Sequence, residues 1–271
     1  MRTMEYKTYL HLFKIKFLSL LQYRVSAITG AITQIFFGFV FIMLYVSFYD
    51  SNASTTNLIS LQTLVNYLWL NQSLFVLVYI WDRDDDLLSM IKNGDIAYEI
   101  LRPINFYLKW FFTMYAKRIA GALMRLIPVL LVAFLFPYPY GMTLPTNFLS
   151  FITFLVLIFL SSIIVTSISM LFHLIVFFTF DEKGILSFLM VIGEIFSGGS
   201  IPIAFFPSFL KQISSILPFR FVCDVPFMAY SNAVDNPLNY IILAILWAII
   251  LIFVGYILSK IAIKRAIIQG G

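Results

Sequence analysis

Two charged residues, Arg125 and Glu194, lie inside otherwise apolar stretches of the sequence. A charge left alone in lipid costs at least about 2.5 kcal/mol, so each of these side chains should face protein or water. One interpretation is an ion pair that joins the two stretches and buries both charges together. The other is that Arg125, which closely follows Arg118, extends its guanidinium to the nearer headgroups. Both interpretations are open from the sequence.

Uncharged polar residues recur in two further apolar stretches. Asn71 and Gln72 lie near the middle of one, and with Arg125 and Glu194 they are the candidate residues of a substrate pathway. A second group is spaced by four, three and four residues along one helical face: Ser162, Thr166, Ser169 and His173. Hydrogen bonds between helices, worth ~0.6 kcal/mol each, explain that spacing better than a polar pathway wall. For Asn71 and Gln72 the two interpretations are equally open.

The sequence lacks the residue patterns on which most catalysis depends. It contains no G-x-x-x-x-G-K-[ST], H-E-x-x-H or G-x-S-x-G motif, and its two histidines, His11 and His173, are far apart. The single cysteine, Cys223, excludes an intrachain disulfide and a cysteine-based metal site. The net charge of +5 comes mostly from residues beside apolar stretches and does not indicate nucleic-acid binding. We therefore expect no enzyme, no catalytic residue, no metal and no nucleic-acid partner.

The composition indicates that lipid is the solvent of this chain. Of its 271 residues 61% are hydrophobic and 11% are charged, whereas soluble domains carry about 25% charged residues. A membrane span takes about 20 residues. The sequence predicts an all-α membrane protein with six spans, at about 25–48, 61–81, 119–136, 149–180, 185–205 and 238–259.

Basic residues predict how these spans are oriented. Fifteen of the 18 Lys and Arg residues lie in residues 1–24, in the loop 81–118, at Lys183 or in the tail after residue 259. The alternate loops hold only Lys211 and Arg220. Cytoplasmic loops carry the excess of basic residues, so both termini and the loop 81–118 are expected in the cytoplasm.

Two regions depart from simple spans. Residues 1–24 place aromatic and leucine residues at steps of three and four, which predicts an interfacial amphipathic helix ahead of one membrane domain, 25–271. A cytoplasmic extension of the first span is the other interpretation. The fifth span is interrupted at Gly193, at Gly198-Gly199 and at Pro202, and the apolar pieces that follow are too short to cross. We therefore expect re-entrant or surface-lying helices at 198–237 on the outer side.

The loop 82–118 has the features of a docking element. A short helix from about Asp84 to Lys92 would carry three aspartates at its start, where acids are favourable. Its apolar stripe is Leu87, Leu88 and Ile91, and an exposed stripe usually has a partner. A turn at Asn93-Gly94-Asp95 and a helix end at or before Arg102-Pro103 complete the element. The other interpretation is an ordinary acidic loop.

Three segments resemble bacterial type-2 ABC (ATP-binding cassette) exporter permeases: IKNGDIAYEILRP at 91–103, GGSIPIAFFPSFLKQISSILPF at 198–218 approximately, and the tail Gln269-Gly270-Gly271. The resemblance implies that Leu87 to Gly94 form a coupling helix, which sits in a groove of a separate ATPase subunit. Asp95 and Arg102-Pro103 would fix its exit. An outer gate would be built from the glycines and prolines of the second segment: Gly198, Gly199, Pro202, Pro207 and Pro218.

The same resemblance implies the partners. Two ABC ATPase subunits would bind ATP and Mg²⁺, so this chain would hold no cofactor, and a second permease, identical or paralogous, would complete the translocation pathway. The cargo would be an exported small molecule, peptide or lipid, and the location a bacterial cell membrane. Two alternatives from other classes are an ion-coupled secondary transporter or channel that uses Arg125 and Glu194, and an immunity or scaffold protein that moves nothing.

Overall fold

The structure is a computed structural model that describes residues 2–51, 59–93, 95–179 and 183–269. Within these ranges every regular element is helical, so the all-α membrane class is confirmed. The four helices that are long and apolar enough to cross a membrane are α2 (Arg24–Ser51), α7 (Phe106–Leu135), α8 (Phe148–Thr179) and α12 (Pro237–Gln269). A bent pair of shorter helices raises that number to five if it is counted as one crossing.

The sequence predicts six spans with the fifth interrupted, and four or five candidate spans among the described residues confirm that prediction in part. The predicted span 61–81 is broken at Leu74 into α3 (Leu61–Ser73) and α4 (Phe75–Val78). The predicted span 185–205 is α9 (Gly184–Ser197), which ends where Gly198 takes the left-handed φ of 84°. A helix cannot continue through a residue in that conformation, and glycine adopts it without a steric penalty.

Helix α7 begins earlier than the sequence predicts. The predicted span started at 119, but the Asn105 side chain accepts a hydrogen bond from the Leu108 backbone N–H at 3.1 Å and caps a helix that begins at Phe106. Residues 106–118, about the last third of the predicted loop 82–118, are thus the first part of α7. The charged residues Lys109, Lys117 and Arg118 are helical, so they project from a fixed backbone and not from a flexible loop.

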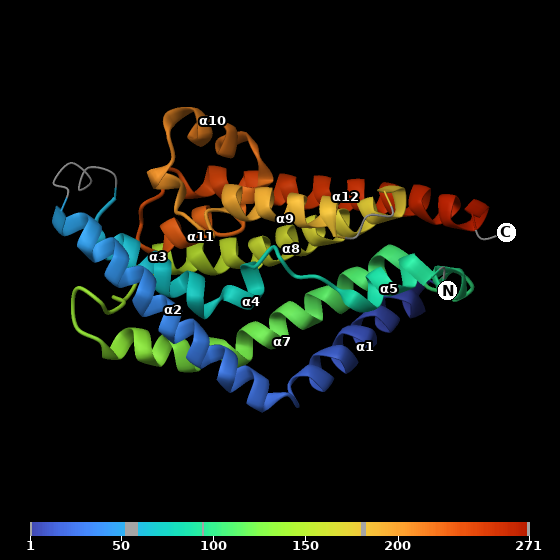
Figure 1. The fold of residues 1–271 in the computed structure, drawn as a ribbon, viewed down its shortest axis with the longest axis horizontal. Coiled ribbons are helices and arrows are strands. Elements are labelled where there is room, and N and C mark those ends of the chain that lie inside the picture. Colours follow the sequence, from blue (N-terminus) through green and yellow to red (C-terminus); the bar gives the residue numbers. More distant parts are fainter. Residues whose placement is uncertain (1, 52–58, 94, 180–182, 270–271) are drawn as a thin grey trace.

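Figure 1 shows α3 and α4 in the middle of the molecule, with α2 and α7 on one side and α8 and α11 (Asp224–Tyr230) on the other. Every residue from Leu64 to Ser73 is buried. Because this helix faces protein on all sides, its polar residues find partners in neighbouring segments and not in lipid. Helix α8 covers nearly the predicted range 149–180, and α12 packs along it.

The first helix, α1 (Arg2–Leu20), packs along α7. Tyr9 is buried there, and its hydroxyl accepts a hydrogen bond from the Asn105 backbone N–H at 2.9 Å. Leu10, Ile15 and Leu18 remain exposed, so apolar residues occupy the outer side of α1 as well as the packed side. The interfacial position of residues 1–24 stays a prediction.

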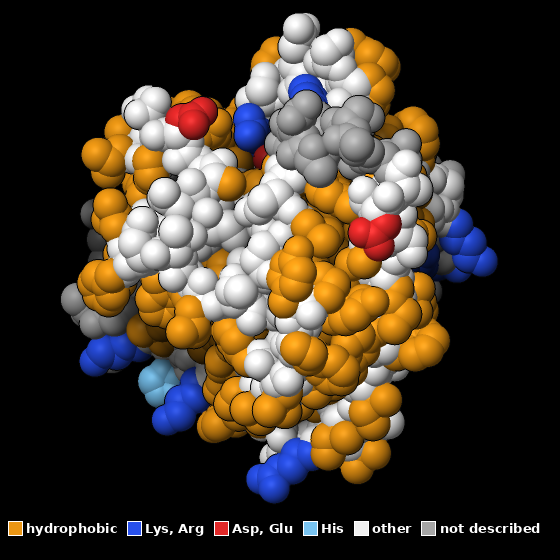
Figure 2. Space-filling model, turned by 90° about the vertical axis from the view of Figure 1, so that its left-hand side faces the viewer, with side chains coloured by type: hydrophobic (Ala, Val, Ile, Leu, Met, Phe, Trp, Pro, Cys, Tyr) orange, Lys and Arg blue, Asp and Glu red, His pale blue; other side chains and the backbone are white. Residues whose placement is uncertain are grey.

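Both termini and α5 lie at one end of the molecule in Figure 1, and the loop between α7 and α8 lies at the other. Figure 2 shows this second end face-on: hydrophobic and uncharged side chains cover most of it, and charged ones are few. The segment between α9 and α12 consists of short pieces: η2 (Ile203–Phe205), α10 (Ser208–Ile216), η3 (Pro218–Phe221) and α11. Pro202 and Pro207 directly precede two of these pieces and Pro218 begins a third, while α10 and η3–α11 form the pair bent by 78°.

Candidate functional site

Helix α5 (Asp85–Asn93) agrees within one residue at each end with the short helix predicted from about Asp84 to Lys92. Asp84 precedes it, and its carboxylate oxygen Oδ1 accepts a hydrogen bond from the Leu87 N–H at 3.1 Å. This bond satisfies one of the backbone donors that a helix start leaves open. Asp85 and Asp86 in the first turn and Lys92 in the last turn complement the helix dipole.

The apolar stripe of α5 faces inward. Leu87, Leu88 and Ile91 are 0%, 2% and 7% exposed, and α5 packs on α8. The expectation that this stripe is exposed for a partner is wrong, because the chain's own helix already covers it. The exposed side of α5 is polar and consists of Asp85, Asp86, Ser89, Lys92 and Asn93.

The exit from α5 leads into α6 (Ile96–Ile100). Gly94 lies outside the described residues, and Asp95 is exposed ahead of α6. α6 ends before Pro103, as predicted. Glu99, which the sequence analysis did not single out, is buried and forms ion pairs with Lys109 of α7 and, at 3.4 Å, with Arg102.

Two large apolar side chains remain exposed at this exit. Tyr98 is 72% exposed and Leu101 is 81% exposed, next to the exposed Arg102 and Pro103. Together with the polar side of α5 they form one surface at the end of the molecule that carries the termini. We call these residues the α5–α6 surface: Asp85, Asp86, Ser89, Lys92, Asn93, Tyr98 and Leu101.

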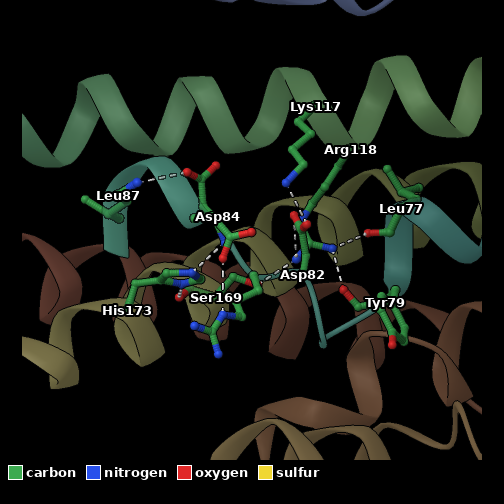
Figure 3. Close-up of polar contacts among 11 residues, drawn as sticks. Leu77, Tyr79, Asp82, Asp84, Leu87, Lys117, Arg118, Ser169 and His173 are labelled. Atoms are coloured by element: carbon green, nitrogen blue, oxygen red, sulfur yellow. Dashed lines mark hydrogen bonds and ion pairs between the residues drawn. The ribbon is translucent and has the colours of Figure 1, made fainter. Parts of the chain in front are cut away.

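A buried arginine of α7 joins the end of α4 to α8 (Figure 3). Arg118 of α7 is 0% exposed. Its Nη1 donates to the backbone carbonyl of Leu77 at 3.2 Å and to that of Tyr79 at 2.6 Å, and its Nη2 donates to Ser169 Oγ at 2.6 Å. The end of a helix leaves carbonyls without partners, and here one side chain satisfies those at the end of α4 while also holding α8.

Asp82 supplies the opposite charge for this arginine. Its carboxylate lies 3.7 Å from Arg118 Nη2 and 3.0 Å from Lys117 Nζ. Burial raises the pKa of the Asp82 carboxyl, but the positive charges of Arg118 and Lys117 outweigh burial and hold that pKa below its usual range. Asp82 is therefore ionised at neutral pH and compensates a charge that would otherwise be buried alone.

His173 of α8 holds the start of α5. Its Nε2 accepts a hydrogen bond from the Asp84 N–H at 3.0 Å, and its Nδ1 lies 2.7 Å from the Ser169 carbonyl oxygen. An acceptor Nε2 and a donor Nδ1 define a neutral imidazole with its proton on Nδ1. We call the connected set the arginine network: Asp82, Asp84, Lys117, Arg118, Ser169 and His173.

Nothing in the sequence predicted that Arg118, Asp82 and Asp84 meet, because Asp82 and Arg118 were placed at the two ends of the loop 82–118 and Asp84 at the start of its short helix. It did single out the stripe with Ser169 and His173, and the favoured helix–helix interpretation agrees with their contacts. The Ser162 hydroxyl of the same stripe donates a hydrogen bond to the Tyr115 hydroxyl oxygen of α7 at 3.2 Å. The available signal was that Arg118 directly precedes the predicted span 119–136 and that the stripe lies within the next predicted span, 149–180.

The two charges inside apolar stretches do not meet. Glu194 of α9 accepts a hydrogen bond from the Ile80 N–H at 3.3 Å. Arg125 of α7 lies against α2, where a Cβ added to Gly30 would be 2.4 Å from the Arg125 Cζ. Of the two open interpretations, the ion pair between them is absent from the described residues.

Polar residues of α3 hold the residues that follow α9. Tyr67 donates from its hydroxyl to the Gly198 carbonyl at 2.9 Å, and Asn71 donates to the Gly199 carbonyl at 2.8 Å. Gln72, the residue after Asn71, is also buried. Asn71, a candidate residue of the substrate pathway, is thus hydrogen-bonded to Gly199, a candidate residue of the outer gate.

A second network lies near the start of α3. Asn66 donates to Thr143 Oγ1 at 3.0 Å and to Ser231 Oγ at 3.1 Å, and its side-chain oxygen accepts from the Thr143 N–H at 2.9 Å. Gln62 and Trp69 donate to the carbonyls of Gly141 and Tyr140, and the Tyr230 hydroxyl donates to the Thr143 carbonyl at 2.9 Å. We call this set the asparagine network: Gln62, Asn66, Trp69, Thr143, Tyr230 and Ser231.

In the part of the chain that the structure describes, no group of three or more His, Cys, Asp or Glu residues is placed to hold a metal ion. No curated protein and no solved structure matches the chain. Residues 73–270 match the family described as ABC-2 family transporter protein. That range takes in most of the chain, including the α5–α6 surface, the arginine network and the region from α9 to α12. The chain belongs to the ABC-2 transporter family and is a multi-pass membrane protein of the non-catalytic, transport-subunit class.

Proposed function

We propose that this chain is the permease subunit of an ATP-driven exporter in a bacterial cell membrane. Two permeases, identical or paralogous, enclose the translocation pathway, and two separate ATPase subunits bind ATP and Mg²⁺ and drive it. The observation that carries the proposal is the α5–α6 surface, which is exposed at the end with both termini and is joined to the membrane helices by the arginine network. Family membership supports the ATPase as the class of partner.

In this proposal the chain crosses the membrane six times. The crossings are α2, α3 with α4, α7, α8, α9 and α12, with the termini and α5 in the cytoplasm. The basic residues of the sequence support this orientation. The broken segments α3–α4 and α9 are tolerated at membrane depth because protein surrounds α3, and because side chains bond the Gly198 and Gly199 carbonyls after α9.

The surface offered to the ATPase differs from the one that the sequence suggested. Since Leu87, Leu88 and Ile91 pack on α8, they shape α5 and do not contact the partner. The acidic side of α5 and the apolar pair Tyr98 and Leu101 contact the ATPase instead. A partner groove with basic residues and an apolar pocket fits such a surface, because exposed large apolar side chains mark interaction sites.

Arg118 and His173 make α5 and α4 move together. The residues between these two helices, 79–84, are held near both ends, at the Tyr79 carbonyl by Arg118 and at the Asp84 N–H by His173. A displacement of α5 by the ATPase is therefore transmitted to the end of α4, because the connecting residues 79–84 are held in place. Inward-open and outward-open states must differ in such contacts for ATP to shift the balance between them.

The test is a double variant of the exposed apolar pair, Tyr98→Asp with Leu101→Asp. Neither side chain is packed, so we expect normal membrane insertion and an unchanged melting temperature. ATPase co-purification and ATP-driven transport should fall by about tenfold or more, which corresponds to the loss of ~1.4 kcal/mol of binding. The matched control is Tyr138→Asp with Leu144→Asp, whose side chains are 74% and 76% exposed in the loop between α7 and α8.

The proposal is wrong if the Tyr98 and Leu101 variant binds the ATPase and transports as the wild type does. It is also wrong if the purified chain transports at full rate without an ATPase, a result that would favour the ion-coupled alternative. Survival of the biological activity after loss of ATP hydrolysis would favour an immunity or scaffold role.

A further inference from the structure

Arg125 has no protein partner in the described part of the chain. Its side chain is half-buried between α7 and α2, and its Nε is buried without a hydrogen-bond partner. The guanidinium fills the space that Gly30 leaves on α2: a Cβ there would lie 2.4 Å from Cζ and 2.7 Å from Nη1. Any larger residue at position 30 would push the guanidinium out of this place.

A second unsatisfied polar group lies one turn further along the same face of α2. Gln34 is 4% exposed, and neither the nitrogen nor the oxygen of its amide has a hydrogen-bond partner. Buried polar groups are bonded in the great majority of cases, so an exception calls for an explanation. Here two exceptions, Arg125 Nε and the Gln34 amide, occur on helices that pack together, and Gln34 follows Gly30, against which Arg125 lies, by four residues, or about 6 Å along α2.

Among the residues that the structure describes, no acid forms an ion pair with Arg125. Glu194, the other charge within an apolar stretch, bonds the Ile80 N–H, and Asp82 pairs with Lys117 and Arg118. A guanidinium in a membrane helix is unfavourable by at least about 2.5 kcal/mol unless an anion or water reaches it. An anion or water from outside the described residues must therefore reach Arg125.

The depth of the site selects the kind of anion. Gly30 follows the start of α2 at Arg24 by six residues, or about 9 Å along the helix. Exposed Thr29 and Thr33 flank it, while the neighbouring Ile28 and Ile32 are 60% and 61% exposed and apolar. A half-buried guanidinium beside exposed threonines and an apolar surface, near the end of a span, suits a molecule with an anionic headgroup and an acyl tail.

We propose that Arg125, which lies against Gly30, and Gln34 form a binding site for the phosphate group of an anionic amphiphile that approaches α2 and α7 from the lipid. The planar guanidinium binds phosphate oxygens through two parallel N–H donors, which an ammonium group does not reproduce. The Gln34 amide supplies a neighbouring donor. The site does not depend on the proposed ATPase, and it assigns to Arg125 a phosphate ligand in place of a protein partner.

The test is native mass spectrometry of the purified chain, with phosphatidylglycerol and phosphatidylcholine added in equal amounts. Wild type should retain phosphatidylglycerol in preference. Arg125→Gln should reduce that preference by about tenfold, and Arg125→Lys should reduce it nearly as far because the fork geometry is lost. Gly30→Ala and Gln34→Leu keep the charge of Arg125 and should weaken retention by a few fold. The matched control, Arg24→Gln, removes an exposed charge near the same end of α2 and should change little.

Equal retention by wild type and by Arg125→Gln overturns the proposal. An equal loss in Arg24→Gln and Arg125→Gln also overturns it, since attraction would then be a property of the surface charge. If Arg125→Gln fails to fold by its melting temperature, Arg125→Lys and Gln34→Leu decide by the same criterion. Competition by inorganic phosphate at matched concentration identifies a soluble phosphate as the ligand. Retention that resists inorganic phosphate identifies the lipid phosphodiester.

Discussion

The arginine network and the asparagine network hold opposite ends of the same buried segment, α3–α4, by different chemistry. At the end of α4 a single charged side chain, Arg118, bonds two backbone carbonyls and one hydroxyl. At the start of α3 the hydrogen bonds are shared among neutral amides, hydroxyls and an indole. The Asn66 side chain bonds two other segments, through Thr143 and Ser231. One end depends on one residue, and the other depends on several.

The difference matches what each end is joined to. The arginine network continues through Asp84 and His173 into α5, the helix that we propose to move with the ATPase. The asparagine network joins α3 to the loop between α7 and α8 and to the end of α11. A buried charge is costly when its partners are lost, so the α4 end favours one defined arrangement more strongly than the α3 end does.

The largest effect is expected for Arg118→Met. This change leaves the Leu77 and Tyr79 carbonyls and Ser169 without a donor, and it removes the charge that Asp82 faces. We expect a destabilisation on the order of 3 kcal/mol, measured as a lower melting temperature in detergent, together with less transport per ATP hydrolysed in the assembled complex.

The matched control for Arg118→Met is Arg102→Met. Arg102 lies at the same end of the molecule and pairs with Glu99, but its side chain is 58% exposed. Its removal should change stability by less than about 1 kcal/mol. Equal effects of the two substitutions would show that burial of Arg118 does not matter, and the comparison of the two networks would fail.

A smaller effect is expected for Asn66→Leu. The Thr143 N–H and the Ser231 hydroxyl lose a partner, which costs about 1–3 kcal/mol, but the bonds of Gln62, Trp69 and Tyr230 to the same loop remain. The melting temperature should fall less than for Arg118→Met, while transport per ATP hydrolysed stays near that of the wild type. A larger loss of stability than in Arg118→Met would reverse the order proposed here.

The smallest effect concerns acid pH. The pKa of Asp82 is lower in the folded chain than its usual value, which is about 3.9 in the unfolded chain. Its stabilising contribution is therefore present above that value and is lost as pH falls through the folded pKa. Between pH 6 and pH 3 the wild-type melting temperature should fall further than that of Asp82→Asn. The asparagine network has no acidic group, so the melting temperature of Asn66→Leu should fall by as much as that of the wild type over this range. Equal decreases in the melting temperatures of the wild type and Asp82→Asn would contradict the role of Asp82.

Local sequence signals predicted the helices whose causes are local. The long apolar runs gave α2, α8 and α12, and the acidic start and apolar stripe gave α5 within a residue or two. Asn105 could have shown that α7 begins early, since asparagine is a favoured helix cap, but the charges that follow it favoured a loop. The break at Leu74 has no glycine or proline beside it, and only the contacts of α3 and α4 with other helices reveal it.

By itself the sequence determined that this chain is a membrane protein, that most of its basic residues lie at one end, and that a short acidic helix lies there. These features follow from composition and periodicity, which depend only on residues close in sequence. Only the tertiary structure decided which face of α5 is exposed, and that Arg118, Asp82 and His173 meet although Arg118 and His173 lie on different helices. It also decided that Arg125 and Glu194 stay apart. The reason is that the cost of burying a polar group depends on which partners from distant segments reach it, and sequence spacing within one helix does not specify them.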